Sequence, residues 1–121
     1  MSKLILIADD DKGIVEVTKI VLEEAGFTTM VAYDSASVLE SIKTSKPALL
    51  LLDIWLAGEN GATLAKQLKS QKATKKLPIV MISANNNVEQ MAVDSEADDF
   101  IAKPFDIDYL VEVVRKYTHE N

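Results

Sequence analysis

The sequence contains no cysteine, which excludes disulfides and thiolate metal sites. Its longest basic run is Lys75-Lys76 and its net charge is −6, so we expect no nucleic-acid binding by this segment. It also lacks an apolar run of membrane-spanning length and a signal peptide. These absences predict a small, acidic, cytoplasmic domain that does not contact membranes.

What is present suits one domain covering residues 1–121. The chain is 48% hydrophobic and 26% charged, which is ordinary for a globular protein with a sizeable core. Five short apolar or β-branched segments have strand length, and they are residues 4–8, 27–33, 48–53, 78–82 and 99–102. Because helical patterns separate them, we expect a doubly wound α/β fold whose five-stranded parallel sheet has the order 2-1-3-4-5.

Apolar residues at helical spacing indicate the inner faces of the helices. In the first helix these are Ile14, Val17, Thr18, Val21, Leu22 and Ala25, with Val15 and Ile20 outside. The inner residues of the next three helices are Val38, Leu39 and Ile42, then Leu64, Ala65 and Leu68, then Val88, Met91, Ala92 and Ser95. In the last helix they are Ile107, Leu110, Val111 and Val114, with Tyr109 and Val113 outside.

Polar side chains follow four of the predicted strands. Asp9-Asp10 follows the first strand, Asp53 ends the third, Ser83 the fourth, and Lys103 the fifth. The carboxyl ends of parallel strands form the ligand-binding edge of such sheets, so these side chains should lie together. Alone, Asp10, Asp11 or Ser83 could cap a helix and Lys103 could be a surface lysine; their joint placement favours a site.

Three neighbouring carboxylates repel one another unless a cation is bound. Oxygen ligands suit Mg²⁺, which leaves room for a phosphate, and Mn²⁺ is an alternative ion. Lys103 and Ser83 add a positive charge and a hydroxyl donor, both suited to a phosphoryl group. The pattern therefore indicates a metal-assisted phosphoryl site with a nucleophilic carboxylate.

At these positions the chain resembles the receiver domains of two-component response regulators, of the single-domain chemotaxis-regulator type. The resemblance runs from Leu4 to about Tyr117, and its motifs are ILIADDD at 5–11, LLDI at 51–54, ISA at 82–84 and ADDFIAKPF at 97–105. It implies a flavodoxin-like (βα)5 fold. It also implies that Asp53 is the phosphoacceptor for a histidine kinase or a histidine phosphotransfer protein.

The resemblance assigns further roles. Asp10 and Asp53 would ligate Mg²⁺ directly, Asp9 through water, and the Trp55 backbone carbonyl would complete the set. Lys103 would bind the phosphoryl group, and its bond to Pro104 would be cis. Ser83 and Phe100 would move together as the switch.

The implied output is a changed surface on the fourth helix, fifth strand and fifth helix, which would contact a downstream protein or a second copy of the chain. The protein would then be a phosphorylated switch that assists its own phosphorylation and dephosphorylation, and not an enzyme. Four positions depart from the family pattern. Ala57 replaces a proline, Ser95-Glu96 replaces Ala-Gly, Trp55 is bulky, and Phe100 lacks a tyrosine hydroxyl.

Three other functions compete with this interpretation. A phosphatase of the haloacid-dehalogenase type would need an aspartate where Trp55 stands. A nucleotide or flavin binder would need a phosphate-binding loop where Asp9-Asp10-Asp11 lies. A docking domain that is never phosphorylated would not need the full set of site residues that this sequence has.

Overall fold

The computed structural model describes residues 2–84 and 88–118 and contains the predicted parallel sheet. Its strand order is β2-β1-β3-β6-β7, which is 2-1-3-4-5 when these five strands are numbered along the chain. The strands are β1 (Leu4–Ala8), β2 (Thr28–Ala32), β3 (Leu49–Asp53), β6 (Ile79–Ser83) and β7 (Asp99–Ala102). The fold is flavodoxin-like, as predicted.

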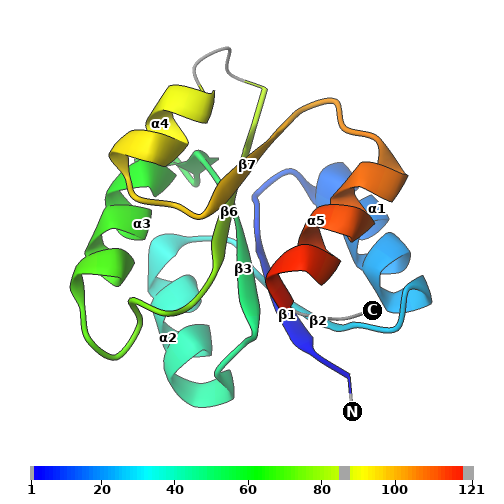
Figure 1. Ribbon diagram of the computed structural model, residues 1–121, viewed down its shortest axis with the longest axis horizontal. Coiled ribbons are helices and arrows are strands. Elements are labelled where there is room, and N and C mark those ends of the chain that lie inside the picture. Colours follow the sequence, from blue (N-terminus) through cyan, green and yellow to red (C-terminus); the bar gives the residue numbers. More distant parts are fainter. Residues whose placement is uncertain (1, 85–87, 119–121) are drawn as a thin grey trace.

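Five helices cover the two faces of this sheet (Figure 1). They are α1 (Lys12–Glu24), α2 (Ser35–Ser45), α3 (Gly61–Ser70), α4 (Val88–Asp94) and α5 (Ile107–Thr118). Helices α2, α3 and α4 pack on one face, and α1 and α5 pack on the other. Among the described residues, no helix has the length and apolar character needed to span a membrane.

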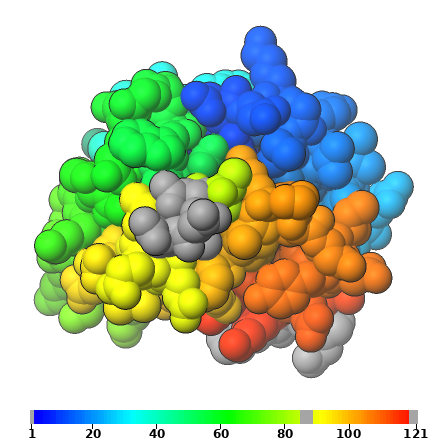
Figure 2. Space-filling view, turned by 90° about the horizontal axis from the view of Figure 1, so that it is seen from above, coloured from blue at the N-terminus to red at the C-terminus, as the bar shows by residue number. Residues whose placement is uncertain are grey.

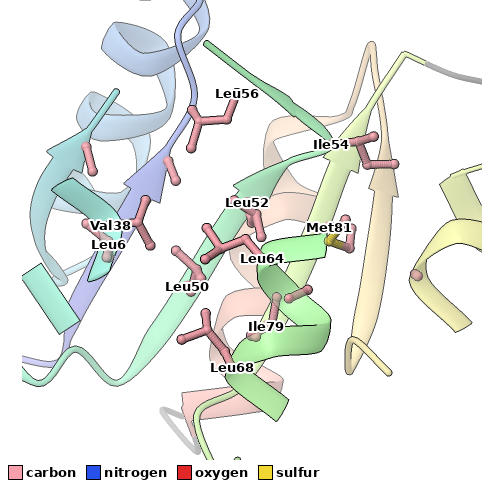
Figure 3. Packing of buried hydrophobic residues seen from close by; sticks show 14 residues of the cluster. Leu6, Val38, Leu50, Leu52, Ile54, Leu56, Leu64, Leu68, Ile79 and Met81 are labelled. Carbon is pink, nitrogen blue, oxygen red and sulfur yellow. The ribbon is translucent and has the colours of Figure 1, made fainter. Parts of the chain in front are cut away.

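The central strand β3 supplies both halves of the core because its side chains alternate between faces. Leu50 and Leu52 point toward α3 (Figure 3), whereas Leu49 and Leu51 pack with residues of α1 and α5. All four leucines are fully buried. Asp53 is therefore presented at the end of a strand held on both faces.

The predicted inner faces of α1 and α5 were wrong at several positions. Val17 is 48% exposed while Val15 is buried, and Ile107 is 49% exposed while Val113 is buried. In both helices apolar residues flank the stripe on each side, so spacing alone fits two rotations of the helix. Packing selects the one centred on Val15, Thr18 and Leu22 in α1, and on Leu110, Val113 and Val114 in α5.

The other predicted faces fit the structure better. Val38, Leu64, Ala65 and Leu68 are buried, and Leu39 and Ile42 are half-buried. Ala92 of α4 is buried, as is Ser95, which directly follows this helix. The side chain of Val88 lies outside the described residues. The segment after Asp53 contains a two-stranded hairpin of β4 (Trp55–Leu56) and β5 (Glu59–Asn60).

Candidate functional site at the carboxyl edge of the sheet

The predicted site residues meet at the carboxyl edge of the sheet. Figure 2 views the molecule from above this edge, where the blue segment after β1, the green hairpin after β3 and the orange segment after β7 lie side by side. One carboxylate oxygen from each of Asp9, Asp10 and Asp53 lies within 4.8 Å of the others. The three carboxylates predicted to bind a metal ion are thus brought together.

Lys103 links two of these carboxylates. Its ammonium nitrogen lies 2.9 Å from Asp9 Oδ2 and 3.5 Å from Asp53 Oδ2. Burial alone would lower the pKa of Lys103, but the hydrogen bond and charge of Asp9, together with the charge of Asp53, outweigh it and raise that pKa. Lys103 therefore stays a cation and balances part of the negative charge of the site.

Asp53 is the most perturbed carboxyl group of the site. Burial and the neighbouring charge of Asp9 raise its pKa to about 6, against the partial opposition of Lys103. Its Oδ1 accepts a hydrogen bond from the Trp55 backbone N–H at 3.3 Å. Burial and Asp9 thus disfavour the ionised form of Asp53, and a bound cation would stabilise that form.

The backbone around Asp53 is fixed by Gly61, the first residue of α3. A Cβ at Gly61 would collide with the Asp53 carbonyl oxygen, and the Gly61 N–H donates to the Ile54 carbonyl. Only glycine allows this close approach. The Asn60 side chain then caps α3 by accepting from the Ala62 N–H at 2.8 Å.

The hairpin also contacts the acidic cluster. The Ala57 N–H donates to Asp10 Oδ2 at 3.0 Å. Ala57 and Gly58 have φ of 52° and 80°, so they form the two-residue loop of the hairpin with both residues left-handed. Sequence reasoning missed this contact, because the alanine itself carries no turn signal.

Of Asp10 and Asp11, both candidates for capping the first helix, the structure selects Asp11. Asp11 is the N-cap of α1, and its carboxylate accepts from the N–H groups of Gly13 and Ile14. Asp9 is instead almost fully buried and accepts from the Asp11 N–H at 2.9 Å. Capping thus falls to Asp11, which leaves Asp9 and Asp10 facing the site.

The remaining predicted residues surround the cluster. Ser83 is buried at the end of β6, and its carbonyl accepts the Lys103 N–H at 2.9 Å. The Lys103–Pro104 peptide bond is cis. Phe100 is half-buried against the core on the side of α2, α3 and α4. Trp55 is 52% exposed on β4.

Comparisons with known proteins agree with this geometry. The family model described as the response regulator receiver domain matches residues 5–115. The chain is 36% identical over 123 aligned residues to the DNA-binding response regulator MtrA of Mycobacterium tuberculosis, covering 100% of this chain and 53% of MtrA. It is 36% identical over 107 residues to the phosphate regulon regulator PhoB of Escherichia coli, covering 87% and 47%. The chain thus spans about half the length of these relatives.

Solved structures of response regulators are also similar to this chain. A protein from Chloroflexus aurantiacus assigned as a response regulator has a TM-score of 0.93 at 30% identity, covering 98% of this chain and 99% of that one. The receiver domain of NtrX from Brucella abortus has a TM-score of 0.86 at 36% identity, covering 97% and 99%.

Proposed function

Because the chain belongs to the response regulator receiver domain family of two-component systems, we propose that Asp53 accepts a phosphoryl group from a histidine kinase or a histidine phosphotransfer protein. The observation that carries this proposal is the convergence on Asp53 of two further carboxylates and one half-buried lysine. Phosphoryl transfer needs a nucleophile, a metal site and a cation for the phosphoryl oxygens. Asp53, the acidic cluster and Lys103 would supply these in turn.

The acidic cluster fits Mg²⁺, with Mn²⁺ as the alternative ion. The donors are oxygens within 4.8 Å of one another. The pKa of Asp53 is raised first by burial and then by the charge of Asp9, and a cation would offset both effects. We propose Asp10 and Asp53 as direct ligands, Asp9 as a ligand through water, and the Trp55 carbonyl as a further ligand. The bound ion would neutralise negative charge between Asp53 and an incoming phosphate.

The proposed transfer follows from the positions of the side chains. A carboxylate oxygen of Asp53 attacks the phosphorus of the partner's phosphohistidine, and a P–O bond forms as the P–N bond breaks. The electron pair stays on the imidazole nitrogen, which takes up a proton. Lys103 then shifts its ammonium from Asp9 toward the phosphoryl oxygens, and the Ser83 hydroxyl donates to another of them.

Phosphorylation would switch a surface of α4, β7 and α5. The phosphoryl group carries about −1.5 to −2 charge in place of the single carboxylate charge of Asp53, and it brings several acceptor oxygens beside Ser83 and Lys103. The Ser83 carbonyl already pairs with the Lys103 N–H between β6 and β7, so movement at Ser83 has a direct path to β7 and Phe100. We propose that the surface then binds a downstream protein or a second copy of the chain.

Other properties proposed for this domain rest on its charge. With a net charge of −6, the segment itself is unsuited to DNA, although MtrA carries "DNA-binding" in its name. We propose a cytoplasmic domain that works as a switch and not as an enzyme. Trp55 stands where a phosphatase of the haloacid-dehalogenase type would need its second aspartate.

Phosphorylation can be tested with acetyl phosphate and Mg²⁺, followed by intact mass spectrometry. We expect one acid-labile phosphoryl group on the wild type and none on Asp53→Asn or after chelation of the metal. Asp11→Asn is the matched control, because asparagine retains the helix cap and Asp11 is not a proposed ligand. Labelling of Asp53→Asn at the wild-type rate would refute the phosphoacceptor assignment.

The homodimer version of the output can be tested separately. Tyr109 is 46% exposed on α5 and is a candidate contact residue. Val113, which was also predicted to face outward, is buried and so does not belong to this surface. Light scattering with and without beryllofluoride, which stands in for the phosphoryl group, should show a mass increase that Tyr109→Ala weakens. A monomer in both states would exclude the homodimer and leave a foreign partner.

A further inference from the structure

A hollow of about 810 Å³ lies at the edge of the sheet opposite the acidic site. It is formed where α2 and α3 end, and by the residues just before β3 and β6. Figure 1 shows both helices on the same face of the sheet, with these ends at the bottom of the view. The volume falls within the roughly 300–1,000 Å³ typical of binding pockets. The hollow is therefore large enough to hold several side chains of a ligand.

The floor of the hollow is apolar. Leu39 and Ile42 of α2, Leu68 of α3 and Leu77 before β6 line it. Leu68 is fully buried in the core, while the other three are only half-buried, so their free surface faces the hollow. An occupant would gain by placing apolar groups against these side chains.

Three lysines, Lys43, Lys46 and Lys76, line the same hollow, and all are exposed. Within residues 2–84 and 88–118, none of them forms an ion pair. Two come from the end of α2 and one from the segment before β6, so positive charge flanks the apolar floor from both sides. These three positive charges thus lie beside an apolar surface in a chain whose net charge is −6.

Lys69, near the same end of α3, provides an internal comparison. Its ammonium lies 2.6 Å from Asp98 Oδ2 and donates to the carbonyls of Leu77 and Lys75, and its side chain is only 9% exposed. Lys69 thus supports the fold by holding the α3–β6 segment. Within the part of the chain that the structure describes, the side chains of the three lining lysines make no such contacts, so they can pair with a ligand.

We propose that this hollow is a second docking site, and that it binds an acidic, amphipathic segment of a partner protein. Apolar side chains of the segment would cover Ile42 and Leu77, and its Asp or Glu side chains would pair with Lys43, Lys46 and Lys76. Charge complementarity selects an acidic occupant, and the apolar floor selects one that alternates acidic and apolar side chains. The site lies away from Asp53, so docking and phosphorylation can be measured independently.

The experiment selects ligands from a displayed library of random twelve-residue peptides, with the wild-type chain as bait. We expect enriched peptides to combine several acidic residues with apolar ones. A synthetic peptide of that sequence should bind at least fivefold more weakly to Lys43→Gln/Lys76→Gln, and its binding should weaken as salt is raised. Ala73→Trp, which adds a ring at the exposed lining position Ala73, should also reduce binding.

Lys66→Gln/Lys72→Gln is the matched control. It also removes two positive charges, one from α3 and one from the segment that follows α3, but neither residue lines the hollow. Binding should stay within twofold of wild type in this control, and all variants should still be phosphorylated on Asp53. Equal weakening in both double variants, enrichment of peptides without acidic residues, or no enrichment at all would each overturn the proposal.

Discussion

The backbone N–H of Ala57 donates a hydrogen bond to the carboxylate of Asp10 across 3.0 Å. This contact ties the hairpin that follows the proposed phosphoacceptor to a proposed metal ligand. It depends on the left-handed conformation of Ala57, with φ of 52°. Proline, the residue that the family pattern has at this position, can neither donate this bond nor adopt that φ. The departure from the family pattern therefore accompanies a different loop conformation.

Ala57→Pro should lower the free energy of unfolding by about 1–3 kcal/mol, because it removes a donor and forces the hairpin loop to rearrange. Urea unfolding without metal measures this change. Ala57→Gly tolerates the same φ and keeps the N–H, so it should stay within about 1 kcal/mol of wild type. If the proline variant is as stable as wild type, the hairpin adopts another conformation in solution.

Stability should depend on pH through Asp53 when metal is chelated. The pKa of Asp53 rises from 3.8 to about 6 on folding, so the folded state binds its proton more tightly than the unfolded state. The resulting stabilisation is complete below about pH 4 and is lost as pH rises through about 6, with an upper limit of about 3 kcal/mol. Urea unfolding should therefore show wild type losing stability between these pH values.

Asp53→Asn should reduce this loss, because the amide stays neutral at every pH. The variant should be the more stable protein above about pH 7 without metal. Saturating Mg²⁺ should reverse the order by stabilising the ionised carboxylate of wild type. Parallel pH profiles for the two proteins would contradict the raised pKa.

Glu96→Gly should stabilise the fold by about 1 kcal/mol. Glu96 has φ of 66° at the end of α4, where the Ala97 N–H bonds to the Ala92 carbonyl and the Glu96 N–H to the Val93 carbonyl. This is the Schellman arrangement, in which glycine avoids the steric cost of the left-handed residue. Urea midpoints should rise for Glu96→Gly and stay near wild type for Glu96→Ala. A decrease for the glycine variant would contradict the left-handed cap.

Trp55 is the single tryptophan and lies half-exposed beside Asp53, so its emission should respond to the site. We expect Mg²⁺ to change the fluorescence and beryllofluoride to change it again. We also expect the indole ring to hinder the water that hydrolyses the acyl phosphate, since hydrolysis requires correct placement of that water. Trp55→Asn should then lose its phosphoryl group faster, as followed by intact mass over time. Equal or slower loss would exclude this shielding.

Strand order and the meeting of Asp9, Asp10, Asp53 and Lys103 could be predicted because parallel strands place their carboxyl ends at one edge. The rotation of α1 and α5 about their own axes could not be predicted, since apolar residues lie on both sides of the inner face of each helix. The Ala57 contact depends on a backbone conformation that alanine rarely adopts, so no residue type signalled it. Side-chain identity determines chemistry well, but among the residue types only proline fixes a backbone dihedral angle.

The burial of β3 has a consequence for how firmly Asp53 is held in place. Leu49 to Leu52 are fully buried, and their strand pairs with β1 on one side and β6 on the other. Amide hydrogens in such a strand exchange with solvent only when most of the molecule opens. We therefore expect Asp53 to be anchored to a slowly exchanging part of the protein. Local opening of α4 or of the hairpin would then leave the proposed phosphoacceptor in place while the proposed output surface fluctuates.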